Sequence, residues 1–168
     1  MNIGVTGHQN LKGKLLKEWI EIELKKALEN RPEIQTARSC LAIGADQIFA
    51  NIVLKMSIDL IGVIPSDQYE NTFSHTKQKE YHKLLARCQR TEILNFDRPS
   101  EQAFFAASKH LVDRSHLLFA IWDGKQANGL GGTGDVVEYA LSLGKSVIHL
   151  HSVTKTVNTL SNKDIIIK

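Results

Sequence analysis

Short apolar runs alternate with segments of helical periodicity along most of the chain. Near-continuous β-rich runs cover residues 2–6, 38–43, 60–64, 92–95, 117–122 and 146–150. Between these runs, apolar residues recur at the spacing of one helix face, as at Ile20, Leu24 and Leu28. The pattern predicts about six strands separated by helices.

Strands that are apolar at nearly every position are typical of a parallel sheet whose two faces are covered by crossover helices. We therefore predict an α/β, Rossmann-like three-layer sandwich with a mostly parallel central sheet. Residues 1–151 are expected to form one domain. Residues 152–168 form a polar tail, in which residues 165–167 either pair as an edge strand or fray.

Composition narrows the classes of protein that the chain resembles. With 168 residues and 42% hydrophobic residues it matches one globular domain, which excludes a disordered or fibrous protein. The net charge is +3 and the basic residues are interspersed with acidic ones, so nucleic acid is not the expected partner. No apolar stretch has the length of a membrane span and no secretion signal is seen, which predicts a cytoplasmic protein.

No metal or cofactor is expected from the sequence. Cys40 and Cys88 lack CxxC spacing and are interpreted as reduced, mostly buried thiols. His149 and His151 alternate on a predicted strand without a third nearby ligand.

Ligands of an open parallel sheet bind beyond the carboxyl ends of its strands. The loops after the first, second, third and fifth predicted strands are therefore the candidate site. Their small, polar and aromatic residues are Thr6, Gly7 and His8; Gly44, Ala45 and Asp46; Pro65 and Tyr69; and Trp122, Asp123 and Gly124. Asp46 also has the side chain of a helix N-cap.

A glycine-rich loop precedes the last predicted helix. It contains Gly131, Gly132, Thr133 and Gly134. Glycines permit close approach of the backbone, and the helix start offers free N–H groups and the positive end of the helix dipole to an anion. The loop is either a phosphate-binding element or only a connection between strand and helix.

Other side chains near these loops leave two interpretations open. Tyr69, Phe73 and Trp122 either stack on a base or belong to the core. Arg98 and Arg114 either hold a phosphate or lie solvated at the surface.

Three carboxylates lie close to the glycine-rich loop in the sequence. Asp123, Asp135 and Glu138 either contact ribose or act as base or nucleophile. Asp135 and Glu138 are also favoured by the dipole at a helix N-terminus without any catalytic role.

Several of these motifs together resemble the SLOG superfamily, over roughly residues 2–150. They are Ile3-Gly4-Val5-Thr6-Gly7-His8, Gly44-Ala45-Asp46, Trp122-Asp123-Gly124, and Gly131-Gly132-Thr133-Gly134-Asp135-Val136-Val137-Glu138-Tyr139-Ala140 followed by Gly144-Lys145. The superfamily contains the LOG phosphoribohydrolases, DprA-like proteins and nucleotide-sensing domains of bacterial defence systems. The resemblance implies a Rossmann-like fold with a nucleotide or nucleotide-derived ligand over the glycine-rich loop, commonly in a homodimer or larger homo-oligomer.

The enzymes among these relatives have a carboxylate that this chain lacks. LOG enzymes carry Pro-Gly-Gly-x-Gly-Thr-x-x-Glu, and the distantly similar nucleoside deoxyribosyltransferases place a nucleophilic Glu three residues after Gly-Thr. Aligning Gly132-Thr133 on that pair puts Val136 at the position of the Glu, and residues 128–130 lack the Pro-Gly-Gly start. Asp135 and Glu138 are rotated from that position by about 100° and 200° on a helix.

The favoured prediction is therefore a nucleotide-binding or nucleotide-sensing domain. The alternative is a nucleoside 5′-monophosphate N-glycosidase (a phosphoribohydrolase) or a nucleoside deoxyribosyltransferase-like enzyme. In that case Asp135, Glu138 or Asp123 supplies the carboxylate and Arg114 holds the phosphate. DNA binding, as in DprA-like proteins, is the third hypothesis.

Overall fold

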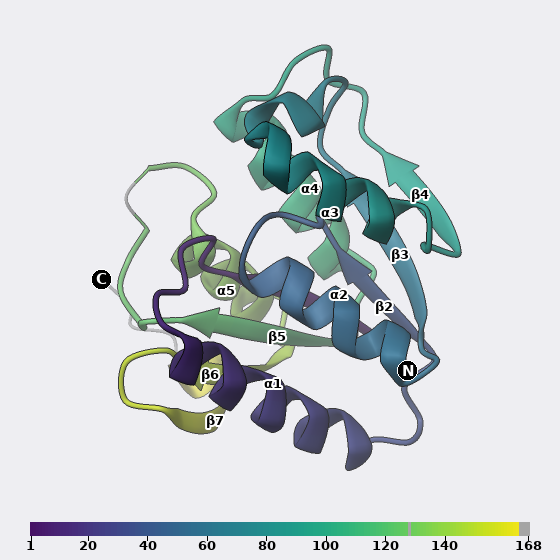
Figure 1. Ribbon diagram of the computed structural model, residues 1–168. Coiled ribbons are helices and arrows are strands. Elements are labelled where there is room, and N and C mark those ends of the chain that lie inside the picture. The colour runs from purple at the N-terminus through teal and green to yellow at the C-terminus, as the bar shows by residue number, and fades with distance from the viewer. Residues whose placement is uncertain (128, 165–168) are drawn as a thin grey trace.

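The computed structural model describes residues 1–127 and 129–164, and it has the predicted α/β architecture (Figure 1). A seven-stranded sheet has the order β4-β3-β2-β1-β5-β6-β7. Its strands are β1 Asn2–Gly7, β2 Thr36–Ser39, β3 Asp59–Ile64, β4 Arg90–Ile93, β5 Leu117–Trp122, β6 Ser146–His151 and β7 Thr156–Leu160. All neighbours pair in parallel except β6 and β7, which are antiparallel.

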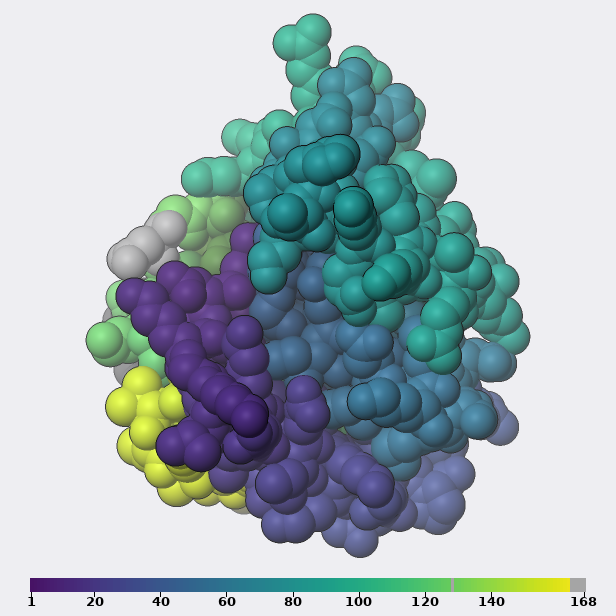
Figure 2. Space-filling model, viewed as in Figure 1, coloured from purple at the N-terminus to yellow at the C-terminus, as the bar shows by residue number. Residues whose placement is uncertain are grey.

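Helices cover both faces of the sheet and create two separate apolar layers. Helices α1 Lys14–Glu29, α2 Ala45–Lys55 and α3 His75–Leu85 cover one face, and α4 Glu101–Asp113 and α5 Thr133–Ser142 cover the other. The first layer packs around Phe49 and Phe119, which are fully buried. The second contains Leu118, Ala120 and Val136. In Figure 2, α1 and the nearby strand β7 lie together at one end of the molecule.

The edge strand β7 differs from the sequence prediction, which considered residues 165–167 for this role. Those residues lie outside the described part of the chain. β7 instead uses a mostly exposed, Thr- and Asn-containing segment, and it pairs with β6 from Val147↔Leu160 to His151↔Thr156. Its backbone bonding to β6, rather than apolar burial, gives this segment its structure.

A partly buried ion pair links β2 and β4 beneath α4. Arg38, which is 5% exposed, donates from Nε and Nη2 to the two carboxylate oxygens of Glu92 at 3.3 and 3.2 Å. His110 Nε2 lies 2.8 Å from Glu92, and Arg90 donates to it at 3.1 Å. Burial opposes ionisation of Glu92, but these hydrogen bonds prevail and lower its pKa to about 2. The network therefore fixes the outer half of the sheet to α4.

Within the described residues, none of the helices combines the length and the apolar character needed to cross a lipid bilayer.

Candidate functional site

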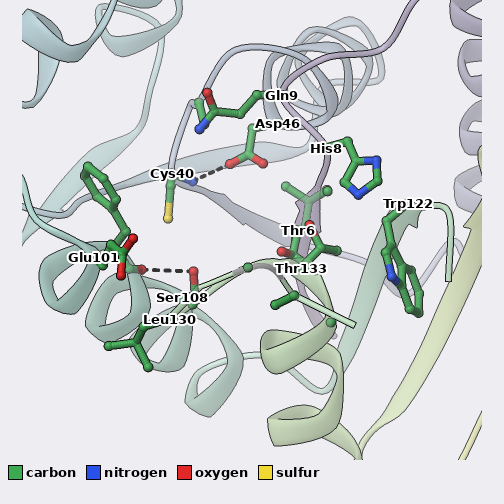
Figure 3. Close-up of a pocket in the computed structure, with 18 of the residues that line it drawn as sticks. Thr6, His8, Gln9, Cys40, Asp46, Glu101, Ser108, Trp122, Leu130 and Thr133 are labelled. Carbon is green, nitrogen blue, oxygen red and sulfur yellow. Dashed lines mark hydrogen bonds between the residues drawn. The ribbon is translucent and has the colours of Figure 1, made fainter. Parts of the chain in front are cut away.

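The strand order places a crevice at the carboxyl end of β1. From β1 the chain moves through α1 towards β2, whereas its other neighbour, β5, is reached later through α4 on the opposite face. Such a reversal of strand order is where open α/β sheets bind ligands. A pocket of about 1200 Å³ opens there, and residues from the ends of β1, β2, β3 and β5 line it (Figure 3).

Most of the predicted ligand-binding residues line this pocket. They are Thr6, Gly7, His8, Asp46, Pro65, Tyr69, Trp122, Asp123, Gly124, Gly131, Gly132, Thr133 and Gly134. Their loops are far apart in the sequence, and the parallel sheet brings them to one edge. Thr6 and Thr133 lie close to one another at the centre of the view in Figure 3.

Arg114 lies away from this pocket. It follows α4 and precedes β5, so it stands at the amino ends of the strands, beside a smaller hollow of about 420 Å³ that Lys145 also lines. Lys145 Nζ there donates to the carbonyls of Asp113 at 3.0 Å and Ser115 at 2.8 Å. Arg98 is exposed and does not line the main pocket either. The arginines proposed for phosphate are therefore not positioned to reach a ligand at the switch point.

Gly44 and Ala45 support the pocket from beneath without lining it. The amide of Ala45 donates to the His8 carbonyl at 3.1 Å, which joins the loops after β1 and β2. Gly44 has φ +89°, and a Cβ there would lie 2.5 Å from the His8 oxygen and 2.4 Å from the Gln9 oxygen. Only glycine fits this junction.

The amino end of α5 opens into the pocket. Gly132 is the N-cap and makes no side-chain cap bond, and the Gly131 amide donates to Asp135 Oδ2 at 2.8 Å. The amides of Thr133 and Gly134, in the first turn, have no hydrogen-bond partner among the described residues. They present free donors and the positive end of the helix dipole to the pocket.

The three candidate carboxylates occupy different surroundings. Asp135 is bonded to Gly131, and Glu138 is exposed on α5, so neither lines the pocket. Asp123 does line it, with Oδ1 3.6 Å from His8 Nε2 and Oδ2 3.8 Å from Lys125 Nζ. Val136, at the position of the family's Glu, is 1% exposed in the apolar layer under α5.

Asp46 is a buried carboxyl group that also reaches the pocket. Helix α2 begins at Ala45 with Gly44 as N-cap, so Asp46 lies inside the first turn and is not the predicted cap. Its Oδ2 accepts from Ser39 Oγ at 3.1 Å and from the Cys40 amide at 3.0 Å. Burial raises the pKa of Asp46 to about 7, although these bonds and the Ala42 amide act in the opposite direction.

Several lining residues were not identified from the sequence. They come from α4 and from the loops after β1, β2, β3 and β5: Gln9, Cys40, Ala42, Thr72, Glu101, Phe104, Ser108, Lys125, Gln126, Ala127 and Leu130. The signal for Glu101 was present, because a helix that follows the fourth strand also starts at the carboxyl edge of the sheet. Figure 3 shows Glu101 and Ser108 on one wall, across from Thr133.

The charged lining is mainly acidic. The acidic lining residues are Asp46, Glu101 and Asp123. Among the described residues, the basic lining residues are His8 and Lys125, whose side chain is 80% exposed. An anionic group in this pocket would therefore be held by backbone amides and the α5 dipole more than by cations. The acidic side chains suit ligand hydroxyl or amino groups.

Trp122 already makes contacts within the protein through both its ring and its N–H group. Its indole ring stacks on His149 with ring centroids 4.0 Å apart, and its Nε1 donates to the Lys125 carbonyl at 2.9 Å. Burial lowers the pKa of His149, which keeps the ring neutral. Trp122 therefore shapes the wall and fixes the start of the loop that leads to the glycines.

Comparison with solved structures gives the fold of the chain. DNA processing protein A (DprA) from Streptococcus pneumoniae superimposes with a TM-score of 0.63 and 18% identity, covering 88% of this chain and 49% of DprA. The protein TM1055 superimposes with a TM-score of 0.56 and 16% identity, covering 89% of this chain and 73% of TM1055. The chain thus spans about half the length of DprA.

Comparisons at the level of sequence add no relative. No family model matches the chain. No curated protein matches it either. The structural likeness agrees with the fold implied by the glycine, Gly-Ala-Asp and Trp-Asp-Gly motifs: the chain has the Rossmann-like fold of these two proteins.

Proposed function

We propose that the protein binds a nucleotide or a nucleotide-derived phosphate ester in this pocket and acts as a binding or sensing domain. The observation that carries the proposal is the pair of amides at Thr133 and Gly134, which have no partner in the part of the chain that the structure describes and open into a pocket of about 1200 Å³ at the reversal of strand order. A phosphoryl group accepts hydrogen bonds from such amides and is stabilised by the helix dipole. The likeness in fold to DprA and TM1055 supports this proposal.

The rest of the pocket fits the remainder of a nucleotide. The hydroxyl groups of Thr6 and Thr133 lie close together in the pocket and suit ribose hydroxyls. The carboxylate of Asp123 lines the same pocket and can accept from a ribose hydroxyl. Apolar contact is offered by Leu130, which is 46% exposed, and by Phe104. A pocket that combines apolar contact with a few convergent polar groups is typical of a small-molecule site.

Binding is favoured over N-glycosidic cleavage by the surroundings of the carboxylates. Val136 replaces the expected Glu and is buried in the core, and Asp135 is committed to Gly131. A glycosidase of this design would need Asp123 as its carboxylate. We therefore expect tight binding without release of a free base.

A substitution at Thr133 tests the phosphate site. Thr133→Asp places a carboxylate in the first turn of α5, where the dipole stabilises it while its charge repels a phosphate. The matched control is Thr76→Asp, in the first turn of α3 and outside the pocket. The measurement is calorimetric titration and thermal unfolding with mononucleotides, ADP-ribose and cyclic dinucleotides.

At about 100 times its Kd, a true ligand should stabilise the wild type and Thr76→Asp by about 2.7 kcal/mol and leave Thr133→Asp unshifted. No shift of the wild type with any nucleotide, or an equal shift in Thr133→Asp, overturns the proposal. Free base released in proportion to enzyme, abolished by Asp123→Asn, would instead establish the glycosidase.

A further inference from the structure

The pocket has a second polar end, far from α5, beneath the ends of β2 and β3. From β5 to β3 the sheet crosses three strand spacings, about 14 Å. Cys40, Asp46, Tyr69, Thr72 and Phe104 line this end. A ligand whose phosphate meets α5 would present its opposite end, the base of a nucleotide, to this group of side chains.

Tyr69 is held rigidly but its hydroxyl is left without a partner. The residue is 4% exposed, and its ring packs edge-on against Phe73 at 5.0 Å and Phe104 at 5.9 Å between centroids. No hydrogen bond to its hydroxyl occurs among the described residues, and the residue lines the pocket. The hydroxyl is not one of the fully buried polar atoms, so it is accessible from the pocket although its ring is buried, and it is free to donate to a ligand atom.

The Asp46 carboxylate has an acceptor position to spare beside Tyr69. An ionised carboxylate has about four acceptor positions. Ser39 Oγ and the amides of Cys40 and Ala42 account for three. Burial raises the pKa of Tyr69 well above its ordinary value, and the nearby Cys40 and Asp46 groups raise it further, so the phenol stays protonated close to the carboxylate.

Building on the proposed function, we propose that Asp46 and Tyr69 select the base of the nucleotide. The Asp46 carboxylate accepts from an exocyclic amino group, and the Tyr69 hydroxyl donates to the adjacent ring nitrogen. This acceptor-donor pair matches adenine and cytosine. Hypoxanthine and uracil have an oxo group in place of the amino group and an N–H in place of the ring acceptor. Their oxo group would face the carboxylate with no hydrogen to donate to it.

Matched nucleotide pairs test this selection on the full chain. AMP against IMP and CMP against UMP differ at the amino and oxo positions and share the sugar and phosphate. Calorimetric titration at pH 8.5 keeps Asp46 ionised, because its pKa is about 7. The variants are Asp46→Asn and Tyr69→Phe, and the matched control is Tyr81→Phe, which removes a hydroxyl from the same aromatic cluster outside the pocket.

We expect the wild type and Tyr81→Phe to bind the amino member of a pair at least about tenfold more tightly than the oxo member. Tyr69→Phe should weaken the amino member about tenfold and leave the oxo member nearly unchanged. Asp46→Asn should remove or reverse the preference, because the amide also offers a donor.

Two results distinguish base selection by Asp46 and Tyr69 from nucleotide binding as such. Equal binding of the amino and oxo members, both lost in Thr133→Asp, overturns base selection and leaves phosphate binding intact. Absence of binding for all four nucleotides and for every other ligand tested overturns both. If Asp46→Asn fails to fold, the Tyr69→Phe comparison still decides the question.

Discussion

The carboxylate of Asp135 accepts a hydrogen bond from the amide of Gly131, four residues earlier, at 2.8 Å. Gly131 has φ +79°, and a Cβ there would lie 2.7 Å from Phe105 Cβ, so the loop is folded tightly against α4. Asp135, in the first turn of α5, thus holds the loop that precedes its own helix in place. Asp135 has a structural role that proximity in sequence alone had left open.

Removing the hydrogen bond between Gly131 and Asp135 should make the loop less rigid. Asp135→Ala deletes a charge-assisted hydrogen bond and a favourable contact with the helix dipole, so the free energy of unfolding should fall by about 1–2 kcal/mol. Nucleotide affinity should fall as well, because the amides at the helix start lose their fixed position. Glu138→Ala, exposed on the same helix, should change stability by less than about 0.5 kcal/mol. Equal effects of the two variants in urea unfolding would show that the bond contributes nothing.

The partly buried network around Glu92 predicts how stability falls at acid pH. Because the folded pKa of Glu92 is lowered to about 2, its contribution is present above pH 4.5 and is lost as the pH falls towards 2. Glu92→Gln should unfold more easily at pH 7, by about 2–3 kcal/mol, and should lose less stability than the wild type between pH 5 and pH 2. Parallel urea curves at several pH values measure both effects. Glu29→Gln, an exposed partner of Lys25, is the control and should follow the wild type.

Asp46 predicts the opposite trend at higher pH. Its pKa is raised from 3.8 to about 7 in the folded state, so folding is favoured while the group is protonated and loses stability as the pH rises from about 4 through 7. Asp46→Asn cannot ionise and should flatten the curve in this window. Relative to the variant, the wild type should be less stable at pH 8 than at pH 5, by an amount of order 1 kcal/mol or more. A constant difference between the two proteins across pH 5–8 would contradict a raised pKa.

A comparison of Gly13 with Gly44 distinguishes the cost of backbone strain from the cost of a steric clash. Gly13 and Gly44 both have positive φ, +91° and +89°, but a Cβ at Gly13 meets nothing within 4 Å, whereas at Gly44 it meets the His8 and Gln9 carbonyls. Gly13→Ala should therefore lower stability by about 1–3 kcal/mol, the backbone strain of a side chain at this positive φ. Gly44→Ala adds the clash with two carbonyls to that strain, so it should lower stability further and also weaken nucleotide binding, since the loops after β1 and β2 must separate. Thermal unfolding of the pair would reject this explanation if both alanines had the same effect.

The sequence was sufficient for the architecture and for the side of the sheet that holds the pocket. Parallel strands such as β5 are apolar on both faces, and loops at their carboxyl ends meet at one edge by topology. The same logic applied to chain direction would have excluded Arg114, because a residue before a strand lies at the amino edge. The edge strand β7 was not predicted at Thr156–Leu160 because its exposed polar residues carry no alternating apolar signal.

The contribution of α4 and the strength of individual interactions needed coordinates. Ser108 lies two turns into α4, and nothing in its spacing distinguishes it from a solvated helix residue. The raised pKa of Asp46 depends on how completely Tyr69 and the loop after β2 exclude water, which is a property of packing. Likewise, the Gly131–Asp135 bond depends on a backbone conformation that local sequence only permits.

Because α2 reaches the pocket from one face of the sheet and α4 and α5 reach it from the other, an occupant would touch both helical layers at once. A bound ligand would therefore connect the helices on the two faces of the sheet directly. Amide hydrogen exchange should then slow on both sides at once, at the starts of α2 and α5, even though those turns share no apolar cluster.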